Sequence, residues 1–138
     1  MANLENLLKL AVDAHASDIF IMAGLPLTYK ANGKLIHVDE DRVMPPQSET
    51  LVQEIYQLGN LDMHRVLDTG DDDFSITVPN LSRFRVSIYR QRGSFAAVIR
   101  IIPFGIPDYR RLQIPEEVMS VAEKTKGLVL VTGPAGGG

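Results

Sequence analysis

Residues 83–102 read RFRVSIYRQRGSFAAVIRII, and their alternation of apolar and polar side chains decides the fold of this chain. Successive side chains of a β-strand point to opposite faces of the sheet, so Phe84 and Val86 face one side while Arg83 and Arg85 face the other. A Gly-Ser turn separates two such runs. The segment therefore predicts two successive antiparallel strands with an apolar face and an arginine-bearing face.

Similar patterns extend the prediction over the rest of the chain. Leucines at helical spacing predict a first helix that Asn3 can cap, and Asn32-Gly33 predicts a tight hairpin. The expected elements are helices over 3–15, from Pro45-Pro46 to 58 (with Leu51, Ile55 and Leu58 on one face) and over 61–67, and strands over 19–21, 27–31, 35–38, 74–78, 84–89 and 95–102. This order predicts an α+β fold with helices on one face of a mixed sheet.

Charge is distributed unevenly along the chain. The 138 residues carry a net charge of −3, yet residues 1–82 hold 13 acidic and 5 basic side chains, and residues 83–111 hold seven Arg and one Asp. Such segregation indicates an anionic ligand on the arginine-rich segment, or an assembly in which the basic face of one copy meets the acidic face of another. A third interpretation is that the charges simply coat solvated strands.

Several classes of protein are excluded by composition. The chain has no Cys, which excludes a disulfide framework, a Cys-based zinc site and a Cys nucleophile, and fits a reducing compartment. Its start lacks the features of a signal peptide, and no apolar run approaches the ~20 residues of a membrane helix. We therefore expect a soluble, cytoplasmic protein.

The last twelve residues, 127–138, read GLVLVTGPAGGG and allow two interpretations. They follow a Pro- and Gly-punctuated linker and a short helix that begins at Pro115. Residues 127–133 form an apolar, β-branched run that is typical of a strand buried in a parallel sheet. The glycines are then either a flexible tail or the start of a phosphate-binding loop.

The loop interpretation has a chemical basis. Gly133 and Gly138 occupy the first and last glycine positions of the G-x-x-x-x-G-K-[ST] pattern, in which backbone N–H groups turn inward around a phosphate. The candidate nucleotide-binding residues of the loop are Gly133, Pro134, Ala135, Gly136, Gly137 and Gly138. Without the Lys and Ser/Thr of the pattern, we do not expect this chain to hydrolyse ATP.

Several stretches, in the right order, resemble the family of type IV pilus and type II secretion ATPases, in particular the twitching-motility (pilus retraction) ATPases. The matching stretches are Ala16-Ser17-Asp18-Ile19-Phe20-Ile21, Ala23-Gly24-Leu25-Pro26, Asp72-Asp73-Phe74-Ser75-Ile76, Arg83-Phe84-Arg85-Val86-Ser87, Val98-Ile99-Arg100-Ile101-Ile102-Pro103 and Gly127 to Gly133. Together they span nearly the whole chain.

The resemblance implies a domain organisation and a function. Residues 1–104 would form a PAS-like N-terminal domain, 105–114 a linker, and 115–138 the first strand and loop of a RecA-like P-loop ATPase domain. Members are cytoplasmic homo-hexamers that bind ATP and Mg²⁺ and work at the inner membrane through a platform protein, with no nucleic acid and no direct membrane insertion. This chain would hold the nucleotide-responsive and assembly domain, which itself needs no cofactor. Because only a short helix precedes Ala16-Ser17-Asp18, retraction is favoured over assembly or secretion.

The resemblance also implies a role for arginines. In the family, Arg residues on these strands reach the terminal phosphate of the nucleotide, a role that would fall to Arg85 and Arg100, with Arg83 as a further candidate. The alternative is that these arginines pair with the acidic run 71–73 across the sheet or across a subunit boundary. For that run itself, a solvated strand entry is favoured over a metal site. The three His residues show no ligand spacing.

Two other functions compete with the motor interpretation. One is a free-standing PAS-like sensor or adaptor that binds a small ligand or a protein partner, with the glycines as a tail. The other is an RNA-binding sheet, which the missing RNP-like spacing and the acidic remainder of the chain argue against.

The motor and sensor interpretations differ at the codon that follows Gly138. We expect Lys and then Ser or Thr, followed by an amphipathic helix, because the loop needs a positive charge on the outer phosphates and a hydroxyl for Mg²⁺. Reading the gene past this codon tests the expectation, and a stop codon there would exclude the motor interpretation.

Overall fold

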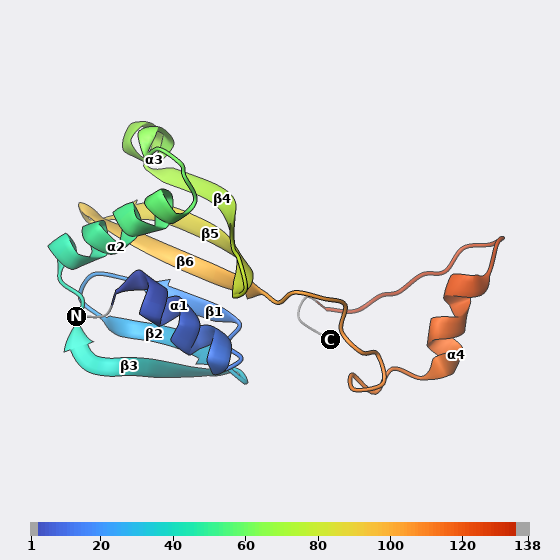
Figure 1. Ribbon diagram of the computed structural model, residues 1–138. Coiled ribbons are helices and arrows are strands. Elements are labelled where there is room, and N and C mark those ends of the chain that lie inside the picture. Colours follow the sequence, from blue (N-terminus) through green and yellow to red (C-terminus); the bar gives the residue numbers. More distant parts are fainter. Residues whose placement is uncertain (1–2, 135–138) are drawn as a thin grey trace. The chain divides into compact units, whose positions relative to one another are not determined.

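The computed structural model describes residues 3–134, and these belong to two compact units (Figure 1). The first unit is Met1–Phe104 and the second is Gly105–Gly138. The elements of the first unit are α1 (Leu4–Asp13), β1 (Asp18–Ile21), β2 (Pro26–Ala31), β3 (Lys34–Arg42), α2 (Pro45–Leu58), α3 (His64–Thr69), β4 (Asp71–Val78), β5 (Ser82–Gln91) and β6 (Ser94–Ile102).

The strands of the first unit form one six-stranded sheet in the order β3-β2-β1-β6-β5-β4. Every neighbouring pair is antiparallel, so the expectation of a mixed sheet is wrong. The helices between β3 and β4 carry the chain from one edge of the sheet to the other, and they do not return it beside a parallel neighbour. The α+β class itself is confirmed.

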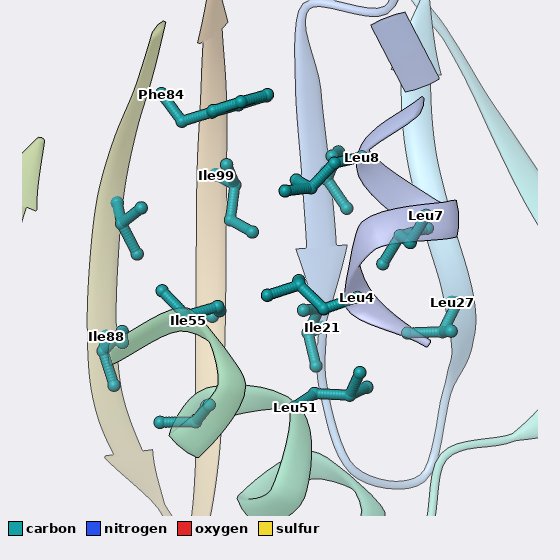
Figure 2. Close-up of a cluster of buried hydrophobic side chains, with 14 of the residues drawn as sticks. Leu4, Leu7, Leu8, Ile21, Leu27, Leu51, Ile55, Phe84, Ile88 and Ile99 are labelled. Carbon is teal, nitrogen blue, oxygen red and sulfur yellow. The ribbon is translucent and has the colours of Figure 1, made fainter. Parts of the chain in front are cut away.

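Helices α1 and α2 cover one face of the sheet and form the core with it (Figures 1 and 2). In α1, Leu4, Leu7 and Leu8 are buried, and in α2, Leu51 and Ile55 are buried. They pack on inward-facing strand residues, among them Ile19, Ile21, Phe84, Val86, Ile88 and Ile99. Burying so many large apolar side chains, at about 25 cal/mol per Å² of apolar surface, makes this layer the main source of stability.

Most of these elements were predicted correctly from local sequence patterns. The Asn3 side chain caps α1 by accepting a hydrogen bond from the Glu5 N–H at 2.6 Å. The hairpin between β2 and β3 turns at Asn32 and Gly33, which have the positive φ angles of 50° and 75° that a tight primed turn requires.

Two expectations about the helical region are wrong in detail. Leu58 is exposed, because α2 ends there and Ile55 and Tyr56 are the residues of its last turn that face the core. The third helix covers His64–Thr69 and not 61–67, since the Asp62 side chain accepts from the His64 N–H and Gly70, at φ 88°, ends the helix.

The second unit contains a short helix, α4 (Glu116–Met119), followed by a 3₁₀ turn at Ser120–Glu123. The expected strand over 127–133 forms no sheet pairing within the described residues, and Leu128, Leu130 and Val131 are exposed. A strand exists only through hydrogen bonds to a neighbour, and no other strand of this unit lies among residues 105–134.

A buried tyrosine ties α2 to the edge of the sheet. The Tyr56 hydroxyl donates a hydrogen bond to Asp72 Oδ2 at 2.9 Å, and Arg65 Nε lies 3.7 Å from Asp72 Oδ1. The Tyr56 ring packs against Phe74 with 5.0 Å between centroids. Burial, followed by the hydrogen bond to the Asp72 carboxylate, raises the pKa of Tyr56 well above its ordinary value.

This pKa shift predicts a loss of stability in alkali. The native state holds Tyr56 protonated, so its contribution to the free energy of unfolding is complete below the ordinary tyrosine pKa of about 10. Above that pH the tyrosine ionises in the unfolded state but not in the native state, and the contribution is lost. We expect Tyr56→Phe to lower the free energy of unfolding by about 1 kcal/mol relative to the wild type at pH 8. At pH 11 this difference should be smaller, because the wild type alone is destabilised by ionisation of the tyrosine in its unfolded state. Urea unfolding at both pH values tests this, and an unchanged deficit would contradict it.

Candidate functional site

The arginines of the sequence pattern lie on the face of the sheet opposite α1 and α2, which we call the open face. Along β5, Phe84, Val86 and Ile88 are buried, whereas Arg83 and Arg85 between them are exposed. On β6, Ile99 is buried and Arg100 is exposed. The expected common face of Arg83, Arg85 and Arg100 is therefore present in the structure.

The register of the two strands brings two of these arginines together. Arg85 lies directly opposite Arg100 in the β5–β6 pairing, while Arg83 lies opposite Ile102. Like charges directly opposite each other on adjacent strands destabilise a sheet. A guanidinium pair in this position is suited to two charge-assisted contacts with one phosphate.

Among residues 3–134, a counter-ion is present for just one member of this arginine pair. Arg100 Nε donates to Asp18 Oδ1 at 3.3 Å, and Asp18 lies directly opposite Arg100 in the β1–β6 pairing. Within residues 3–134, neither Arg83 nor Arg85 forms an ion pair. Arg83 and Arg85 are therefore the arginines of this face that are available to an anionic ligand.

In the part of the chain that the structure describes, the acidic run 71–73 forms no ion pair with Arg83 or Arg85. Asp72 points toward Tyr56 and Arg65, as described above, and Asp73 accepts a hydrogen bond from Ser87. Asp71 accepts from the Thr69 hydroxyl at 3.3 Å. Each carboxylate therefore contacts groups other than the arginines of the open face.

Other arginines of the basic segment contact aromatic rings. The Arg90 guanidinium lies 5.0 Å from the centre of the Phe95 ring, and that of Arg110 lies 5.2 Å from the centre of Tyr109. Arg110 Nη2 also lies 3.4 Å from Glu116 Oε1. Such cation–π contacts hold each of these two side chains against a ring that is close to it in the sequence.

The candidate phosphate loop is described only at its start. Gly133 has open space where a Cβ would stand, and Pro134 is exposed. Ala135, Gly136, Gly137 and Gly138 lie outside the described residues. The loop assignment therefore remains a prediction from the sequence pattern.

The described residues show neither a cluster of metal ligands nor a helix that could cross a membrane. Over residues 3–134, no three His, Asp or Glu side chains gather in a way that would hold a metal ion. His37 Nδ1 instead lies 2.8 Å from the Thr28 hydroxyl. Over the same residues, no helix combines the length and apolar character that crossing a membrane requires.

Asp18 is a site residue whose contact with Arg100 was not predicted from the sequence. The resemblance included it in the Ala16-Ser17-Asp18 stretch, but nothing local connects it to an arginine 82 residues away. No local signal pointed to this contact, because the neighbouring Ser17 is exposed and a carboxylate at the start of a strand can be solvated by water.

Comparisons with known proteins identify relatives of the whole chain. It is 34% identical over 137 residues to the type IV pilus ATPase PilU of Pseudomonas aeruginosa, covering 97% of this chain and 35% of the relative. It is 33% identical over 141 residues to the type IV pilus retraction ATPase PilT of the same organism, covering 99% and 39%. A twitching motility protein of Neisseria gonorrhoeae is 42% identical over 106 residues, covering 75% and 28%. No protein-family model matches the chain.

Solved structures share the fold. The pilus retraction motor PilT with bound ADP superposes with a TM-score of 0.75 at 33% identity, covering 99% of this chain and 39% of that one. The ATPase DotB of Legionella pneumophila superposes with a TM-score of 0.66 at 23% identity, covering 85% of this chain and 33% of that one. This likeness concerns the fold alone. The chain spans about a third of the length of the curated relatives it matches.

Proposed function

Because this chain is a homologue of the N-terminal region of type IV pilus ATPases, we propose that it forms the nucleotide-responsive and assembly domain of a pilus retraction motor. In this proposal ATP binding and hydrolysis, carried out with residues outside this chain, drive domain movement. The relatives do not favour the free-standing sensor, because they match almost the whole chain and are themselves ATPases.

The observation that carries the proposed site is the Arg85–Arg100 pair. Arg85 and Arg100 lie directly opposite each other on β5 and β6, and among residues 3–134 Asp18 forms an ion pair with Arg100 while no carboxylate does so with Arg85. A terminal phosphate would supply the missing negative charge and accept hydrogen bonds from both groups. Arg83, one pleat further along β5, would add long-range attraction.

The remaining parts of the proposal concern the complete protein. Residues 133–138 would begin the loop that holds the nucleotide phosphates, with Mg²⁺ and the loop lysine beside them. We propose a cytoplasmic homo-hexamer that reaches the inner membrane through a platform protein. The names of the relatives, a retraction ATPase and a twitching motility protein, favour retraction as the direction of work.

The phosphate-sensing role predicts a loss of turnover without unfolding. In the protein encoded by the complete gene, Arg85→Ala with Arg100→Ala should lower the ATP hydrolysis rate by at least about tenfold, because charge developing on the transferred phosphate loses two donors. Steady-state phosphate release measures the rate.

Arg42→Ala provides a matched control for this experiment. It removes one positive charge from exposed β3 at the edge of the sheet, away from the arginine pair, and should leave the rate within about twofold of the wild type. An unaltered rate in the double variant would show that Arg85 and Arg100 do not sense phosphate.

A further inference from the structure

Asp18 is held in place more firmly than an ordinary surface carboxylate. The residue before it, Ser17, donates its N–H to the Lys30 carbonyl at 2.8 Å and accepts from the Ile101 N–H at 2.9 Å. The chain is therefore fixed between β2 and β6 as it enters β1. The Asp18 side chain is only 15% exposed, compared with 69% for its partner Arg100.

The contact uses a particular edge of the arginine. Arg100 donates its hydrogen bond to the carboxylate through Nε, and its Nη groups form no hydrogen bond within residues 3–134. A guanidinium has five N–H donors in a rigid plane, so fixing Nε fixes the direction of the other four. The Nη edge remains available for a second anion.

Asp18 has a cationic residue opposite it on each of its two neighbouring strands. On the open face it lies opposite Arg100 on one side and opposite Lys30 on the other. Within the described residues it forms an ion pair with Arg100 and not with Lys30. Without Asp18, repulsion from Arg85 would direct the long Arg100 side chain away from the pair.

We propose that Asp18 is a positioning residue, which holds Arg100 through Nε so that its Nη groups face the same phosphate as Arg85. The inference rests on the proposed function of that pair. It gives the aspartate of the Ala16-Ser17-Asp18 stretch a role at the phosphate site, although its own charge opposes anion binding.

That opposition provides a sharp test. Removing a carboxylate near an anion site strengthens anion binding through the electrostatic field alone, whereas loss of a positioning residue weakens it. We would titrate the 138-residue chain with inorganic tripolyphosphate and follow the backbone amides of β5 and β6 by ¹H–¹⁵N NMR. Asp18→Asn should raise the Kd by about threefold or more, the size of one modest ion pair.

Asp73→Asn is the matched control. Asp73 lies on the same face and has the same charge, but it accepts from Ser87 and forms no ion pair with an arginine of residues 3–134. This variant should bind tripolyphosphate as well as the wild type or slightly better. Asp18→Glu, which keeps the charge one methylene further out, should recover part of the affinity.

Two further readings make the outcome decisive. The Arg100 Nε–H resonance should be protected from solvent exchange in the wild type and in Asp73→Asn, and lose that protection in Asp18→Asn. The same spectra report whether each variant is folded. If Asp18→Asn does not fold, the tripolyphosphate affinity of Asp18→Glu tests the positioning role in its place. Equal or tighter binding by Asp18→Asn would overturn the positioning role alone. No binding by the wild type at β5 and β6 would overturn the proposed phosphate site and this inference with it.

Discussion

The antiparallel pairing of β1 with β6 holds this domain together and builds its candidate site. It joins the three strands from the first third of the chain, β1 to β3, to the three later strands, β4 to β6, in one sheet. On the inner face the pairing sets Ile19 opposite Ile99, and both side chains are fully buried. On the open face the adjacent position sets Asp18 opposite Arg100. A slip of one residue would exchange the two faces, so core and site depend on the same register.

Sequence reasoning succeeded where the determining signal is local. The hairpin turn needs two adjacent residues that tolerate positive φ, and the faces of β5 and β6 follow from alternation within each strand. It failed where distant segments decide. The other neighbouring strands follow each other in the chain, so the antiparallel character of the whole sheet depends on the direction in which β6 pairs with the distant β1, and no local residue pattern encodes that direction.

The same division applies to the site. Alternation predicted that Arg85 and Arg100 share a face, but their direct opposition is a matter of strand register, which the turn at Arg92 and Gly93 sets. The Asp18 contact spans 82 residues and needs the β1–β6 pairing before it exists. The phosphate loop was predicted from a glycine pattern alone, and its function depends on residues that the pattern places after Gly138.

The two arginines would contribute unequally to sensing a phosphate. A ligand shifts a conformational equilibrium only by its difference in affinity for the two states, so each arginine matters by what it gains when the terminal phosphate arrives. A charge-assisted hydrogen bond is worth about 1.5–3 kcal/mol. Arg100 already satisfies Nε through Asp18, whereas Arg85 has no ion pair within residues 3–134. On the proposed function, Arg85 therefore carries most of the difference between the triphosphate and diphosphate states, and Arg100 supplies a prepared geometry for it.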